Sequence, residues 1–240
     1  MAVDHVLMQR ARTTGEAVLR IYTWAAPTLS LGRNQRALGV YDDDALARRR
    51  IVVVRRPTGG RALLHHREIT YSVTSPCHLE ENLGATYSRI NAVLLSGLAA
   101  LGVNASLARP TSRARAPGPP PCFAEPSAGE IVAAGRKLVG SAQWREAGAL
   151  LQHGSIIVDD DQSLIPELMR SPSAPLPPPA SLHALLGRSP SADEVADAMF
   201  TVVRQTVDPS AEPLAEHDVP SLDVAAATGH YHDPSWTWRR

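Results

Sequence analysis

Hydrophobic and polar positions along the chain change over in short segments that predict both strands and helices. Five runs predict strands by their alternation, β-branching or length, namely residues 18–24, 27–32, 51–54, 69–75 and 103–108. Three segments of the first half predict helices, namely residues 1–7, 42–50 and 86–101. Thr86 is expected to cap the last of these helices, and Gly102 is expected to end it.

The second half of the chain predicts a meander followed by one more helix. Residues 130–158 predict three strands joined by turns at Gly135-Arg136 and Glu146-Ala147-Gly148. Residues 191–194 (SADE) have capping-box spacing and open a helix that continues through Val203, after which the tail predicts a loop. Strands joined by hairpins and bracketed by a few helices favour an α+β (mixed α/β) fold over strict βαβ alternation.

Length and proline content predict one domain with two irregular segments. The chain has 240 residues, enough to bury a substantial core, and we expect a single domain over 1–240. The basic, proline-rich run at 109–121 predicts a mobile loop. The run SPSAPLPPPA at 171–180 predicts a proline-rich linker, because proline removes backbone donors and fixes φ.

Composition argues against several classes of protein. The formal net charge is +0, so nothing draws the whole chain to nucleic acid or to an anionic membrane. No apolar run has the length of a membrane span, and no signal peptide precedes the first polar residues. Cys77 and Cys122 lack C-x-x-C spacing and do not pair with histidines at metal-ligand spacing. We therefore expect a reduced, cytoplasmic protein without a metal.

One lysine stands out among the basic residues. The 24 Lys+Arg positions are 23 arginines and Lys137, which lies in the run GRKLVGSAQ at 135–143, a tight turn leading into a strand. Arginine stays protonated, whereas a compact lysine amine can lose its proton when it is buried. The sequence therefore favours a chemical role for Lys137, the alternative being drift towards arginine that spared one lysine.

A glycine pair follows the strand at 51–54. The run RRPTGGRALLHH at 55–66 places Gly59 and Gly60 where the backbone can adopt positive φ and approach a ligand closely. Flanking arginines such as Arg56 can hold an anionic group such as a phosphate. An ordinary hairpin turn is the alternative interpretation.

Three motifs in this order, RRPTGGRALLHHREITYSV, GRKLVGSAQ and ALLQHGSIIV, resemble the lipoate–protein ligase A and octanoyltransferase family. The resemblance implies the biotin/lipoate ligase-like catalytic fold, with a mixed and antiparallel sheet flanked by helices. It also implies transfer of an octanoyl or lipoyl group to a lysine of a lipoyl-domain protein. A biotin ligase is disfavoured, because the glycine loop lacks a G-R-G-R type sequence.

The family has two branches with different chemistry. The segment PCFAEPS at 121–127 resembles the nucleophile segment of cysteine-dependent octanoyltransferases, where ligases typically show an Arg/Asn-Asp pair. Ligases also usually carry a C-terminal accessory domain, and we expect none here. In relatives an opening strand precedes the first helix, so the sheet is expected to be shorter or the native start to lie upstream of Met1.

The resemblance implies a thioester mechanism. Cys122 is expected to carry the acyl group, with Lys137 either stabilising the thiolate as an ammonium or acting as a base. His153 is the second choice for the base. The expected substrate-binding residues are Arg56, Thr58, Gly59, Gly60, His65, Gly140, Ser141, Gln143, His153, Gly154 and Ser155. An apolar slot for the acyl chain is expected along strand residues such as Leu31, Val54 and Leu138.

The expected partners are an octanoyl-acyl carrier protein as donor and a lipoyl-domain protein as acceptor, either glycine cleavage H protein or a 2-oxoacid dehydrogenase subunit. This transfer requires no cofactor. One alternative is an ATP- and Mg-dependent lipoate ligase in which Lys137 and the Arg56 loop hold the adenylate. A second is a non-catalytic lipoyl-domain-binding protein, since His66 replaces the aspartate usual in the family.

Overall fold

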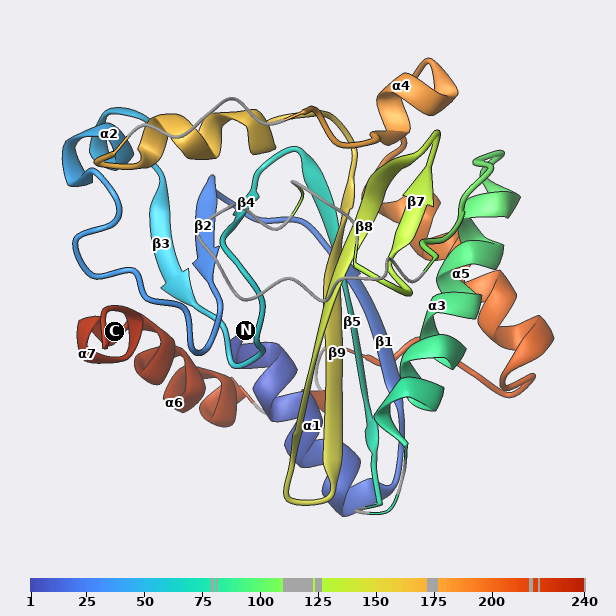
Figure 1. The fold of residues 1–240 in the computed structure, drawn as a ribbon. Coiled ribbons are helices and arrows are strands. Elements are labelled where there is room, and N and C mark those ends of the chain that lie inside the picture. Colours follow the sequence, from blue (N-terminus) through green and yellow to red (C-terminus); the bar gives the residue numbers. More distant parts are fainter. Residues whose placement is uncertain are drawn as a thin grey trace.

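The computed structural model describes residues 1–78, 80, 82–109, 123, 127–171, 177–215, 218–219 and 221–239, and these residues form two β-sheets (Figure 1). The larger sheet has the strand order β1-β5-β9-β8-β7-β6 and is antiparallel throughout. Its strands are β1 (Val18–Tyr22), β5 (Glu68–Pro76), β6 (Ser106–Leu107), β7 (Ile131–Ala133), β8 (Arg136–Glu146) and β9 (Ala149–Ile157).

The smaller sheet has the order β3-β2-β4, with β2 (Thr28–Leu31) parallel to β3 (Val52–Arg55) and antiparallel to β4 (Leu63–His65). It packs against α2 (Asp43–Arg48) and the 3-10 helix η1 (Gln162–Leu168). Leu29, Leu31 and Leu64 meet Ile165 and Leu168 in this second hydrophobic core. A mixed sheet with helices on its faces confirms the α+β fold class predicted from the sequence.

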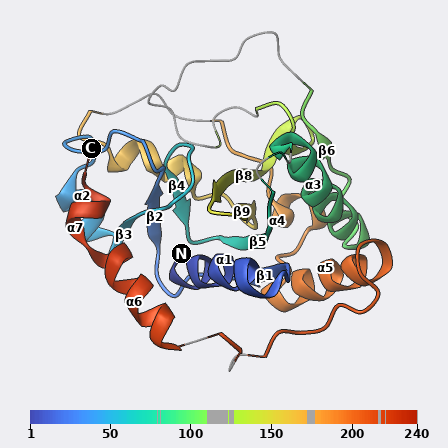
Figure 2. The ribbon, with the colours of Figure 1, turned by 90° about the horizontal axis from the view of Figure 1, so that it is seen from below.

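Helices cover both faces of the larger sheet. α3 (Leu83–Ala100) and α5 (Ala192–Thr206) pack on one face, where Leu98 and Met199 join Tyr71 in the main core. A Cβ at Gly97 would lie 2.3 Å from the sulfur of Met199, so glycine lets these two helices approach closely. α1 (Ala2–Thr14) covers the opposite face through Met8 and Ala11. Figure 2 shows α1 alongside β5 and β1, with α3 and α5 together on the other side.

The C-terminal segment folds as helices and not as the predicted loop. α6 (Ser221–His232) and α7 (Pro234–Thr237) lie beside β3 at the edge of the molecule (Figure 2). Arg55 Nε donates to the carbonyl of Thr237 at 2.9 Å, and Trp236 Nε1 donates to the carbonyl of Arg55 at 2.8 Å. These contacts join residues far apart in sequence, so no local sequence pattern could predict them.

Local signals predicted the other elements with small errors. The meander and the Ser191 capping box are confirmed, and Gly102 has the expected positive φ of 88°. The prediction that Thr86 caps α3 is wrong, because the side chain of Asn82 accepts the N–H groups of Gly84 and Ala85. The strand expected at 103–108 is only β6, and the helix expected at 1–7 continues to Thr14.

Three short elements were not predicted, namely β4, η1 and α4 (Leu182–Leu186). Residues 110–121 of the expected mobile loop and 172–176 of the expected linker lie outside the described residues. Among the helices that are described, none is both long and apolar enough to cross a membrane.

Candidate functional site

Lys137 lies at the start of β8 and is 3% exposed. Its Nζ is 2.7 Å from Glu130 Oε1 and 4.8 Å from the centre of the Phe123 ring. A Cβ at Gly140 would lie 3.0 Å from Lys137 Cε and 3.1 Å from Phe123 Cζ, so the absent side chain leaves room for both. Cys122 lies outside the described residues, but its sequence neighbour Phe123 packs directly on the single lysine.

The glycine loop is held by Arg56, a buried residue. Its Nη1 donates to the carbonyl and to Oγ of Ser30 at 2.9 and 3.0 Å, and its Nη2 donates to the carbonyls of Gly59 and Arg61 at 2.9 and 2.7 Å. Gly60 has φ +96°, and a Cβ on Gly32 would lie 2.0 Å from the Gly60 oxygen. These contacts make Arg56 the residue that shapes the loop, whereas the sequence suggested that it holds an anion.

A second polar chain connects the loop to β9 and α1. Thr58 Oγ1 is 2.6 Å from His153 Nε2, and His153 Nδ1 is 3.9 Å from Asp4 Oδ2. Asp4 is fully buried and also accepts hydrogen bonds from Ser72 Oγ at 2.8 Å and Arg20 Nη1 at 3.0 Å. Burial lowers the pKa of His153 below its ordinary value, although Asp4 acts in the opposite direction. His153 is therefore a neutral hydrogen-bonding partner of Thr58 at pH 7.

The lowered pKa of His153 predicts a pH-dependent stability. The unfolded chain binds this proton more tightly than the folded chain, so the contribution is fully present above about pH 6.5 and is lost as the pH falls below it. We expect the melting temperature of the wild type to fall more steeply between neutral and mildly acidic pH than that of His153→Gln. Parallel slopes for the two proteins would contradict the assignment.

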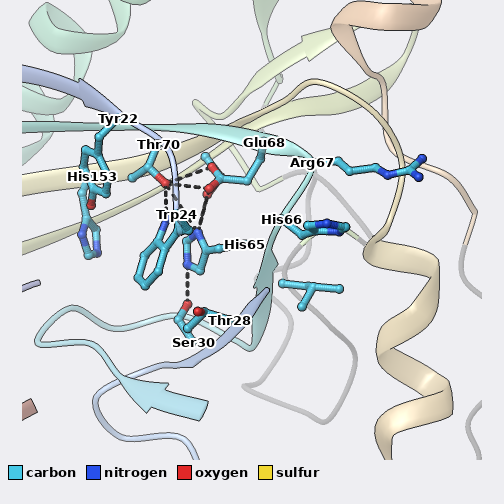
Figure 3. A network of polar contacts seen from close by, with 12 residues as sticks. Tyr22, Trp24, Thr28, Ser30, His65, His66, Arg67, Glu68, Thr70 and His153 are labelled. Atoms are coloured by element: carbon cyan, nitrogen blue, oxygen red, sulfur yellow. Dashed lines mark hydrogen bonds and ion pairs between the residues drawn. The ribbon is translucent and has the colours of Figure 1, made fainter. Parts of the chain in front are cut away.

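His65 is the centre of a buried polar network between the two sheets (Figure 3). Its Nε2 is 2.8 Å from Ser30 Oγ, and its Nδ1 is 3.1 Å from Glu68 Oε1. Trp24 stacks on its ring at 4.2 Å and donates to Thr70, which in turn donates to Glu68. Serine, histidine and glutamate follow the order of a hydrolase triad, but Ser30 is 0% exposed and already accepts Arg56. The network therefore supports the glycine loop.

Ser155 belongs to the same junction, because its Oγ lies 3.4 Å from His65 Nδ1. His66, the residue that departs from the family pattern, is exposed and lies with Nδ1 3.5 Å from Asp161 Oδ2. Thus His65 faces the interior and His66 faces away from it (Figure 3). The substitution of His66 for the aspartate usual in the family therefore lies outside the buried network around His65.

Three expected binding residues, Ser141, Gln143 and Gly154, belong to a polar network around Tyr71 on the α3 side of the larger sheet. Gly154 is the register partner of both Ser141 and Tyr71, and Tyr71 Oη donates to Ser141 Oγ at 2.6 Å across it. A Cβ at Gly154 would lie 2.7 Å from Tyr71 Cε1. Gln152 Nε2 donates to Tyr71 Oη, and Gln143 Nε2 donates to Gln152 Oε1. The side chains of Ser141 and Gln143 thus form a network towards α3, and their contact with substrate stays a prediction.

The structure therefore sorts the expected residues into groups. Those at the junction of the two sheets are Arg56, Thr58, Gly59, Gly60, His65, His153 and Ser155. Phe123 connects Lys137 and Gly140 to this junction by packing on Leu63 of β4 and Ile157 of β9. The prediction that Leu31 and Leu138 line one apolar slot is wrong, because these side chains lie in two separate hydrophobic clusters.

Sequence reasoning missed the acidic and hydroxyl partners of this junction, namely Asp4, Ser30, Glu68 and Glu130. Asp4 lies in the first turn of α1, within the helix predicted at residues 1–7. Glu68 follows His65 within one motif. Nothing in the sequence separated Ser30 or Glu130 from ordinary polar positions.

Comparison with known proteins identifies the class that this fold and junction define. Residues 1–204 match the family model of the lipoyl protein ligase A/B catalytic domain. The chain belongs to the lipoyl protein ligase A/B family, which confirms the resemblance read from its motifs.

Curated relatives share substantial identity with the chain. It is 46% identical over 182 residues to octanoyltransferase LipM of Kyrpidia tusciae, covering 72% of this chain and 66% of the relative. It is 32% identical over 261 residues to octanoyltransferase LipM of Geobacillus kaustophilus, covering 100% of this chain and 93% of the relative. The match to this chain covers 66%, 65% and 61% of the length of the LipM relatives from Kyrpidia, Symbiobacterium and Carboxydothermus, respectively.

Solved structures share the fold. Lipoate-protein ligase A bound with ATP has a TM-score of 0.78 at 22% identity and covers 99% of this chain and 92% of its own. A bi-partite lipoate protein ligase from Thermoplasma acidophilum has a TM-score of 0.75 at 20% identity and covers 99% of this chain and 89% of its own. At these identities the likeness establishes the architecture alone.

Proposed function

We propose that the protein is an octanoyltransferase of protein lipoylation. It moves an octanoyl or lipoyl group from acyl carrier protein to a lysine of a lipoyl-domain protein through a thioester on Cys122. The observation that carries the proposal is the packing of Phe123 on Lys137, with 4.8 Å between the ring centre and Nζ. The relatives named octanoyltransferase LipM support the choice of acyl group.

Chain connectivity supports the pairing of the Cys122 thiol with Lys137. Consecutive Cα atoms lie about 3.8 Å apart across a trans peptide bond, so Cys122 is tethered beside Phe123. Lys137 is buried, and its Nζ lies 4.8 Å from the centre of that ring. A cysteine with an ordinary pKa near 8.5 is mostly protonated at neutral pH, and a nearby ammonium raises its thiolate fraction. Lys137 supplies that ammonium.

The reaction has two balanced steps. In the first, the Cys122 thiolate attacks the octanoyl thioester, a new carbon–sulfur bond forms, and the carrier leaves as its thiolate and takes up a proton. In the second, the amine of the acceptor lysine attacks the acyl-cysteine, the carbon–sulfur bond breaks with the Cys122 thiolate as leaving group, and an amide forms as the attacking nitrogen releases one proton to solvent. Exchange of one thioester for another is nearly neutral in free energy, and aminolysis of a thioester is downhill. The proposed transfer therefore requires neither ATP nor another cofactor.

The groups around the acyl carbonyl have separate roles in this proposal. Gly59, Gly60 and Gly140 let the backbone approach the acyl group, and their N–H groups stabilise the oxyanion. Thr58 and His153 connect the loop to β9 through their 2.6 Å hydrogen bond. The hydrogen bonds from the Arg56 guanidinium to the carbonyls of its own loop support a structural role for Arg56 over the adenylate site of the ligase alternative.

Acyl loading with and without ATP tests the proposal. We expect the wild type, mixed with octanoyl-acyl carrier protein, to gain the mass of one octanoyl group without ATP. Addition of glycine cleavage H protein, or of a lipoyl domain from a 2-oxoacid dehydrogenase, should then discharge it. Transfer of free octanoate or lipoate that needs ATP and leaves no adduct would identify a ligase instead. Capture of the lipoyl domain without turnover in either assay would identify a non-catalytic binder.

A further inference from the structure

One carboxylate makes two contacts beside the proposed nucleophile. Glu130 Oε1 lies 2.7 Å from Lys137 Nζ, and Glu130 Oε2 accepts the backbone N–H of Ser127 at 2.7 Å. The backbone N–H of Glu130 donates in return to the carbonyl of Ser127 at 3.1 Å, which closes a turn. The side chains are 2% exposed for Lys137 and 9% exposed for Glu130.

This turn is close in sequence to the proposed nucleophile. Ser127 and Phe123 both belong to the PCFAEPS run at 121–127 that contains Cys122. Phe123 packs on the Lys137 amine, and Ser127 is bonded to the carboxylate that pairs with the same amine. The ammonium thus contacts one residue of the cysteine segment directly and a second residue through Glu130.

Burial makes the charge of Glu130 necessary for Lys137. A lysine taken out of water tends to lose its proton, and a carboxylate within hydrogen-bonding distance opposes that loss. Two tyrosines also interact with this pair, namely Tyr87 of α3 and Tyr71 of β5, and burial first and the Glu130 carboxylate second raise the pKa of Tyr87. Both tyrosines therefore stay neutral, and the Glu130 carboxyl group lies within hydrogen-bonding distance of the amine.

We propose that Glu130 is a positioning residue, which keeps Lys137 in its ammonium form and fastens that ammonium to the segment carrying Cys122. The inference rests on the proposed function, in which the ammonium stabilises the Cys122 thiolate. It decides between the two roles that the sequence left open for Lys137, because a lysine paired in this way serves as a cation and not as a neutral base.

The protein itself offers a direct measurement, because Lys137 is its single lysine. Isotope-labelled lysine therefore gives one side-chain resonance, whose titration reports the proton of this amine. We expect the wild-type amine to keep its proton to a higher pH than the amine of Glu130→Gln. Glu130→Gln keeps an acceptor for Ser127 but removes the charge, and should move the titration down by roughly one to three pH units. Glu130→Asp should restore most of the difference, and an unmoved titration in Glu130→Gln would overturn the proposal.

A second measurement tests the connection to the thiol. In a Cys77→Ala background, the rate of Cys122 alkylation against pH reports thiolate formation, and Glu130→Gln should shift this profile to higher pH. A profile that stays in place while the lysine titration moves would overturn the fastening to the cysteine segment. If the Lys137 titration and the pH dependence of Cys122 alkylation both shift as expected while the wild type forms no octanoyl adduct, the proposed function is wrong and the role of Glu130 is supported. If Glu130→Gln does not fold, Glu130→Asp must show an intermediate shift in both.

Discussion

Replacement of Lys137 by methionine is expected to lower the rate of octanoyl transfer about 10³-fold. Methionine keeps the apolar stem against Phe123 and Gly140 but removes the ammonium that pairs with Glu130. The Cys122 thiol would then lose its stabilising cation, so acyl loading as well as discharge should slow. Single-turnover measurements of octanoyl-adduct formation, by intact mass at several times after mixing, provide the rate.

Loss of stability needs a matched control, because Lys137→Met leaves the Glu130 carboxylate buried without its partner. Breaking a buried ion pair by removing one member costs about 3–5 kcal/mol. The double variant Lys137→Met/Glu130→Gln removes both charges, and we expect it to recover melting temperature but not activity. Recovery of transfer in the double variant would show that the single variant failed through misfolding, and Lys137 would lose its catalytic role.

The predictable part of the fold is the part held by local signals. The meander of β7, β8 and β9 follows from alternation and from turn residues, and the structure places positive φ at Ala134-Gly135 and Ala147-Gly148. Ser191 and Glu194 form their capping box within one helical turn. By contrast, α6 and α7 are supported by contacts such as that between Trp236 and Arg55, which are 181 positions apart in the sequence. A pattern read in a short window contains no information about such partners.

The candidate site divides in the same way. Lys137 was found because composition isolated it, and the glycine loop was found because adjacent glycines follow a strand. Ser30 is a small polar residue in an apolar strand, and only the approach of β4 makes it a partner of His65. Glu130 belongs to the candidate site because its side chain contacts Lys137, and sequence spacing alone does not predict that contact. Residue type therefore indicated where the candidate site lies, and tertiary contacts determined which neighbouring side chains bond to its residues.

Replacement of Cys122 by alanine is expected to abolish both the octanoyl adduct and octanoyl transfer. The proposed mechanism has no route around the thioester, because the acceptor amine never meets the carrier-bound acyl group in it. Loss of a covalent nucleophile leaves only binding and oxyanion stabilisation, so the remaining rate should lie several orders of magnitude below the wild type. Intact mass after incubation with octanoyl-acyl carrier protein gives the readout.

The chain supplies its own control in Cys77, the second of its two cysteines. Cys77 is 3% exposed at the end of β5, where its backbone N–H donates to the carbonyl of Gly148 at 2.9 Å. A thiol buried at that position is not open to a protein-bound thioester, so Cys77→Ala should load and transfer octanoate as the wild type does. An adduct that persists in Cys122→Ala and disappears in Cys77→Ala would move the nucleophile to Cys77. Since Phe123, and not Cys77, packs on Lys137, that result would also separate the thiol chemistry from the only lysine of the protein.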